Sequence, residues 1–111
     1  MKHIESLASY LHEDWADDYP TSWDAIDDFA TGEPLHASLL RHEVELAIDK
    51  FPADTALAQR LFDLGLRYCP SADGWPTYRE WLLAVADRVD ELLRGQPPEP
   101  PDRPRSGSAQ V

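Results

Sequence analysis

Apolar residues recur every three or four positions along most of this chain, and no segment alternates apolar with polar residues as a strand does. The first stripe is Ile4, Leu7 and Leu11, and the last begins at Trp81 and ends at Leu92. A helix with one apolar stripe must bury that stripe against other helices. The spacing therefore predicts an all-α fold, a compact single-domain bundle of about five helices.

Capping residues, glycines and prolines set the expected ends of these helices. The five helices are expected at residues 1–11, 22–32, 34–51, 54–65 and 77–95. Thr21 or Ser22 is a candidate cap for the second helix, Pro34 suits the first position of the third, and Gly65 suits a left-handed end of the fourth. Asp54 is a candidate cap for the fourth helix, and Thr77 with Glu80 has the spacing of a capping box at the start of the fifth. We expect loops at residues 12–20 and 66–76.

Composition changes at Gly95. Residues 96–111 contain five prolines followed by Ser-Gly-Ser, and they have no apolar cluster to bury. Such a segment cannot compensate the entropy of ordering its chain. We therefore expect one folded domain at residues 1–94 and a disordered Pro/Ser/Gly-rich tail at 95–111. The tail either has no binding role or acts as a proline-rich docking peptide.

The sequence offers neither a disulfide nor a membrane anchor. Its one cysteine, Cys69, cannot form an internal bridge, and no apolar block follows a basic start as in an export signal. The longest apolar run, residues 81–86, is far shorter than the roughly 20 residues that span a bilayer. We expect a cytoplasmic protein.

Negative charge is concentrated in the first third of the chain. The protein has 21 acidic and 10 basic side chains, and nine of the acidic ones lie between His3 and Leu40, where there is no Lys or Arg. A formal charge of -11 repels phosphate backbones and anionic lipid, so we expect no direct nucleic-acid or membrane binding. A basic partner is favoured, although a solvated face without a partner would have the same composition.

Aromatic residues interleave with these carboxylates. Rings inside a charged rim are typical of protein interfaces, where the rings anchor and the charges set the encounter rate. Trp15 and Trp23 can instead complete the core, because large indoles usually do so in a small helical domain. Tyr19, just before Pro20, is expected to be exposed, whereas Trp81 is expected to be structural.

No motif for catalysis or metal binding is apparent. His12, Glu13 and Asp14 are adjacent and cannot all face one ion, and Leu46 stands where a zinc-protease helix starting at His42 needs its second histidine. Opposed carboxylate pairs and glycine-rich phosphate loops are also missing. We expect no enzyme activity, metal, cofactor or small-molecule ligand. A metal-dependent hydrolase that uses His12 and Asp14 is the alternative.

Two segments resemble a known family. Residues 7–15, which read Leu-Ala-Ser-Tyr-Leu-His-Glu-Asp-Trp, are similar to the opening signature of the helical immunity proteins of bacterial contact-dependent growth inhibition systems. The closing pattern of that family is matched by Leu64-Gly65, Tyr68, Pro70, Asp73-Gly74, Tyr78 and Trp81-Leu82. The chain departs from the pattern at Leu11, where Phe is frequent, at Glu13, where Gln is usual, and at the inserted Trp75-Pro76.

The resemblance implies a small protein without enzyme activity that binds and neutralises a toxin domain delivered by a neighbouring cell. The expected partner is the basic carboxy-terminal domain of a cognate or related polymorphic toxin, and a nuclease would have a basic groove that an acidic partner can cover. The residues expected to bind it are Asp14, Trp15, Asp17, Asp18, Tyr19, Asp24, Asp27 and Asp28.

Two alternatives stay open at this point. His12 and Asp14 can hold their loop through hydrogen bonds to the backbone rather than bind a partner. The protein as a whole can be an acidic regulatory adaptor that mimics nucleic acid and binds a basic host protein.

Overall fold

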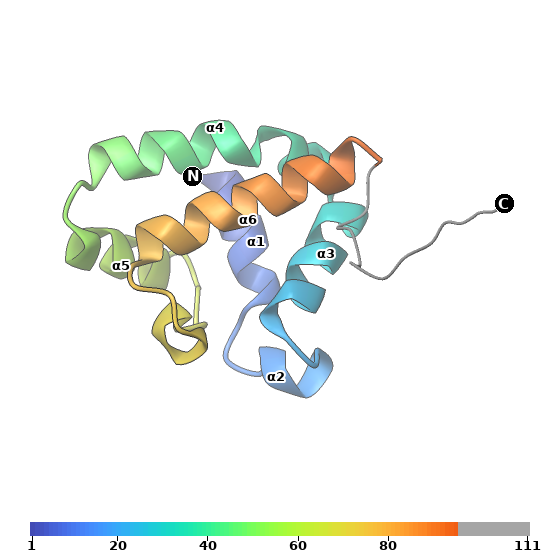
Figure 1. Ribbon diagram of the computed structural model, residues 1–111, viewed down its shortest axis with the longest axis horizontal. Coiled ribbons are helices and arrows are strands. Elements are labelled where there is room, and N and C mark those ends of the chain that lie inside the picture. The colour runs from blue at the N-terminus through green and yellow to red at the C-terminus, as the bar shows by residue number, and fades with distance from the viewer. Residues whose placement is uncertain (96–111) are drawn as a thin grey trace, which may run out of the picture.

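The computed structural model describes residues 1–95, which form six α-helices, one short 3-10 helix and no strand (Figure 1). The elements in chain order are α1 (Lys2–Tyr10), α2 (Trp15–Asp18), α3 (Ser22–Gly32), α4 (Pro34–Lys50), α5 (Asp54–Asp63), η1 (Pro70–Asp73) and α6 (Tyr78–Leu93). The predicted all-α fold is confirmed for this part of the chain. The predicted tail lies, apart from Gly95, outside the described residues.

The five predicted helices correspond to α1, α3, α4, α5 and α6. The structure adds α2, a single turn inside the segment expected to be a loop, and η1 inside the second expected loop. Periodicity over so few residues carries no signal. The turn at α2 is held from outside, because the Trp15 ring packs edge-on against Tyr68 with their centroids 5.6 Å apart.

Local start signals place the early helices as expected. Thr21 is the cap of α3: its hydroxyl accepts a hydrogen bond from the Asp24 amide at 3.3 Å, and the Asp24 carboxylate accepts one from the Thr21 amide at 3.1 Å. Pro34 occupies the first turn of α4, where its missing N–H costs nothing. The left-handed glycine expected after the fourth helix is Gly65, at φ 109°.

The prediction that Asp54 caps its own helix is wrong. Ala53 is at the cap position of α5, and the Asp54 carboxylate instead accepts hydrogen bonds from the amides of Tyr78 and Arg79 at 3.2 and 3.1 Å. The Thr77 hydroxyl accepts from the Glu80 amide at 3.1 Å, which is one of the two hydrogen bonds of the predicted capping box. Asp54 therefore satisfies first-turn amides of α6 from a distance of 24 residues along the chain, and this ties α5 to α6.

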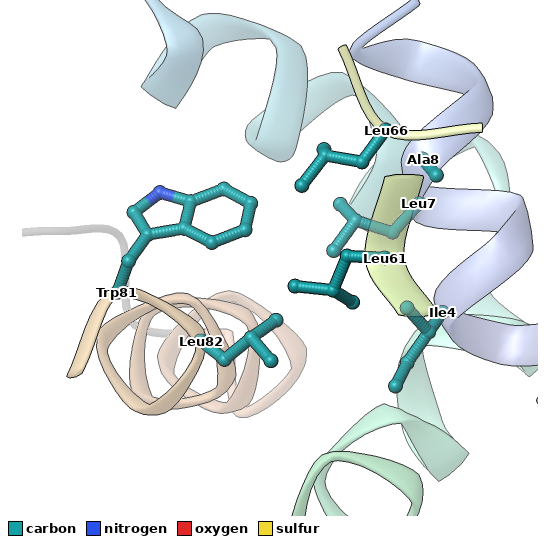
Figure 2. Close-up of a pocket in the computed structure, with 7 residues that line it drawn as sticks. All are labelled: Ile4, Leu7, Ala8, Leu61, Leu66, Trp81 and Leu82. Carbon is teal, nitrogen blue, oxygen red and sulfur yellow. The ribbon is translucent and has the colours of Figure 1, made fainter. Parts of the chain in front are cut away.

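One apolar core lies between the helices. The last helix, α6, packs against α3, α4 and α5, while α1 contacts the same three helices behind it (Figure 1). Figure 2 shows Ile4 and Leu7 of α1, Leu61 of α5 and the Trp81 indole of α6 converging on one apolar interior. The space among them has no room for a water-sized molecule, so this is packed core, and the structural role predicted for Trp81 is confirmed.

Candidate functional site

The eight residues predicted to bind a partner are called the acidic face. They lie in and around α2 and on α3, which pack against each other and are adjacent in Figure 1. Its members are Asp14, Trp15, Asp17, Asp18, Tyr19, Asp24, Asp27 and Asp28. These residues belong to one continuous segment of the chain, and four of them, Tyr19, Asp24, Asp27 and Asp28, line the same pocket.

Three carboxylates surround α2. Asp17 and Asp18 are exposed on the helix, and Asp14 is exposed at its cap. The only basic group near them among the described contacts is the His12 ring, whose Nε2 lies 3.7 Å from the Asp18 carboxylate. These charges face water and are available to an incoming partner.

The His12 side chain stabilises the loop between α1 and α2. Its Nδ1 accepts a hydrogen bond from the Asp14 backbone amide at 3.0 Å. The role predicted for His12 in hydrogen bonding to the backbone is confirmed. Within residues 1–95, no group of three or more His, Cys, Asp or Glu side chains is arranged to hold a metal ion.

A shallow groove open to solvent runs along α3. Its volume is about 490 Å³, and its lining residues are Tyr19, Pro20, Asp24, Asp27, Asp28 and Thr31. The Tyr19 hydroxyl donates to the Asp28 carboxylate at 2.5 Å. This hydrogen bond, and then burial, raise the pKa of Tyr19 to about 12 from its ordinary value of 10.0.

Asp27 differs from its neighbours because its charge is compensated. Arg88 of α6 donates to both oxygens of the Asp27 carboxylate, at 2.6 and 2.8 Å. That hydrogen-bonded pair raises the pKa of Arg88, whose guanidinium carbon also lies 5.2 Å from the centre of the Trp23 ring. Asp27 lines the groove, yet its main contact joins α3 to α6.

The aromatic side chains of this region are partly buried in the protein's own core. Trp15 and Trp23 are half-buried against the core, and Trp23 packs edge-on against Trp75 at 6.3 Å between centroids. Tyr19, expected to be exposed, is also half-buried, because its ring packs against the core while its hydroxyl binds Asp28. Each ring still has part of its surface in water.

Sequence reasoning missed three residues of this region. Thr31 follows Asp27 and Asp28 by four and three positions, so helical spacing alone places it on their face. Pro20 lines the groove beside Tyr19. Arg88 lies 61 positions from Asp27, and no local pattern indicates which of the basic residues would pair with it.

Comparison with known proteins gives one match. A family model described as CdiI immunity protein matches residues 2–89, which include every member of the acidic face. Neither the curated proteins nor the solved structures contain a match to the chain. None of the described helices is long and apolar enough to cross a membrane.

Proposed function

Because the chain belongs to the CdiI immunity protein family, which its match over residues 2–89 shows, we propose that it neutralises a cognate toxin domain by binding it through the acidic face. The resemblance found in the sequence is confirmed by the same match. Membership of this family indicates a toxin-neutralising immunity protein, and such proteins generally act without catalysis. The match is the observation that carries the toxin-neutralising function, and the exposed carboxylates of the acidic face support the proposed binding surface.

The proposed partner surface is basic. Asp14, Asp17, Asp18, Asp24 and Asp28 are exposed and concentrate negative charge on one end of a chain whose formal charge is -11. Such a field attracts a cationic surface over distances beyond direct contact and raises the association rate. A nuclease toxin fits this chemistry, since its substrate groove must be positive to hold phosphate.

The groove along α3 is the proposed seat of individual basic side chains. Its walls carry the Asp24 and Asp28 carboxylates, and Tyr19 presents an aromatic ring beside them. A Lys or Arg side chain can lie against such a ring while its charge meets a carboxylate. Asp27 has mainly a structural role in this groove, because both of its carboxylate oxygens already accept hydrogen bonds from Arg88.

The test is a binding experiment with the toxin domain encoded beside this protein. The wild-type chain should form a one-to-one complex. The variant Asp17→Lys/Asp18→Lys should associate at least about tenfold more slowly at low salt, and the rate should depend less on salt than in the wild type. The matched control, Glu5→Lys/Asp63→Lys, changes net charge equally at exposed positions of α1 and α5, outside the acidic face.

Two results would contradict the proposal. Equal slowing in both variants would mean that only net charge matters and that no acidic face exists. A pull-down that recovers a chromosomal DNA-binding regulator and no toxin would favour the adaptor instead.

A further inference from the structure

The helix α4 has two apolar faces, of which the bundle covers only one. Ala37, Leu40, Val44 and Ala47 are buried. On the other side, Leu35, Leu39 and Leu46 are 73, 46 and 51% exposed. We call Leu35, Leu39, the exposed His42 between the leucines, and Leu46 the α4 stripe.

The spacing of the α4 stripe is what sets it apart from ordinary exposed leucines. Single apolar residues on a surface are normal and need no explanation. The α4 stripe, however, follows steps of four, three and four residues, which is the seam by which one helix packs along another. Elsewhere in residues 1–95, exposed Phe62 lies under the Arg67 guanidinium, at 3.9 Å from the ring centre, and so has a cover already.

The charges beside the α4 stripe favour a basic partner. Arg41, on the same helix, is paired with Asp87 and Asp90 of α6 and lies 3.8 Å from Glu45, so three carboxylates surround one cation. At the far end of the helix Asp49 and Lys50 are both exposed and offset each other, so the excess comes from the carboxylates around Arg41. The rim of the apolar stripe therefore has an excess of negative charge, of the same sign as the acidic face.

A second copy of this chain does not fit the α4 stripe. Two copies would each bring a formal charge of -11 to the contact. Three leucines on one helix also provide far less than the roughly 800 Å² per partner of a stable interface. The α4 stripe is suited to be one anchor within a larger contact with a cationic protein.

We propose that the α4 stripe binds an amphipathic helix of the toxin domain, with its apolar side on the leucines and with Lys or Arg along its flanks. This inference rests on the proposed function. Thr31, at the end of the α3 groove, and Leu35, the most exposed leucine, are separated by only three residues. A single partner can therefore reach both surfaces across the corner between α3 and α4.

The experiment distinguishes the acidic face, which is expected to control the association rate, from the α4 stripe, which is expected to control the dissociation rate. Binding of the cognate toxin domain is measured by surface plasmon resonance for the wild type and for Leu39→Gln/Leu46→Gln, which keeps good helix formers on α4. We expect dissociation to be about tenfold faster or more, because buried apolar anchors act mainly on the off-rate. Association and its salt dependence should stay as in the wild type, in contrast to the Asp17→Lys/Asp18→Lys variant.

The control variant Leu83→Gln/Leu93→Gln makes the same two changes at exposed leucines of α6, and its dissociation rate should equal that of the wild type. Thermal unfolding of each variant alone checks that the fold is retained. If the Leu39→Gln/Leu46→Gln variant dissociates from the toxin domain at the wild-type rate, the inference is overturned and the proposed function still stands. If the wild type is a dimer and this variant is a monomer, the α4 stripe binds a second copy, and the inference is overturned as well. If the wild type forms no complex with the toxin domain, both proposals are overturned.

Discussion

Residues of one type have different roles in this protein. Asp17 is exposed on α2. Asp27, only ten positions later, accepts two hydrogen bonds from the Arg88 guanidinium. The sequence groups both in one acidic segment, because composition and spacing describe charge but not the partner of each charge. Burial and pairing decide which carboxylates support the fold and which ones a toxin can meet.

Asp27→Asn should therefore act mainly by lowering the free energy of unfolding, and only secondarily by weakening the affinity for the toxin. The change leaves the half-buried Arg88 without its anionic partner, and we expect a loss of about 1–2 kcal/mol in the free energy of unfolding. Urea denaturation followed by circular dichroism measures this loss. Asp17→Asn is the control: it removes one exposed charge from the acidic segment and should cause no loss of stability in the same assay, so similar losses in the two variants would contradict the assignment.

The phenols of Tyr19 and Tyr68 should titrate late. The Asp28 hydrogen bond raises the pKa of Tyr19 to about 12, and burial followed by the hydrogen bond to Asp73 raises the pKa of Tyr68 to about 12. Because these folded-state values lie above the ordinary value of 10.0, their stabilising effect is complete below pH 10 and is lost as the pH rises toward 12. Phenolate absorbance gives the titration directly.

In the same titration, Asp28→Asn should move the pKa of Tyr19 back toward 10.0, because it removes the negative acceptor that favours the protonated phenol. Tyr19→Phe should delete one late step and leave that of Tyr68. If Asp28→Asn leaves the titration curve unchanged, the Tyr19–Asp28 hydrogen bond is not formed in solution.

At the level of elements, the sequence predicts what is local. The Thr21 cap, Pro34 and Gly65 each act within a few residues of their own position, so local rules predict Pro34 and Gly65 and narrow the cap to Thr21 or Ser22. The turn at α2 and the pairing of Asp54 with the start of α6 depend on contacts across the fold, so periodicity and capping rules cannot find them. For the candidate site, the acidic segment was predictable, but the groove and the Arg88 pair were not.

Asp54→Ala should destabilise α6 rather than α5. The Asp54 carboxylate accepts from two first-turn amides of α6 and lies near the positive end of that helix, so we expect a loss of about 1–2 kcal/mol. Thr77→Ala removes the cap bond to Glu80 and should cost about 1 kcal/mol. The two changes act on one helix turn, so their effects should not add, and a double-mutant cycle by urea denaturation measures the coupling.

The control for Asp54→Ala is Thr55→Ala, at the next, exposed position of α5. If Asp54 capped its own helix, amide hydrogen exchange in Asp54→Ala would increase at the start of α5. Faster exchange at the start of α6, with α5 unchanged, is the result expected from the observed hydrogen bonds.

At the scale of the whole molecule, charge has opposite consequences for folding and for capture. The carboxylates of the acidic face repel one another, so their concentration costs stability in the free protein while it speeds encounter with a basic toxin. Salt screens both effects, since the Debye length falls from about 10 Å at 0.1 M to about 3 Å at 1 M. Raising sodium chloride should therefore stabilise the free protein and slow its association with the toxin.

The Asp17→Lys/Asp18→Lys variant tests whether the acidic face causes both effects. Removing repulsion at α2 should raise the urea midpoint at low salt and flatten its dependence on salt, because the variant replaces two like charges within the cluster. Glu5→Lys/Asp63→Lys makes the same change in net charge outside the cluster and should keep a salt dependence closer to that of the wild type. If the two variants respond equally to salt, repulsion is spread over the whole surface and is not localised at the acidic face.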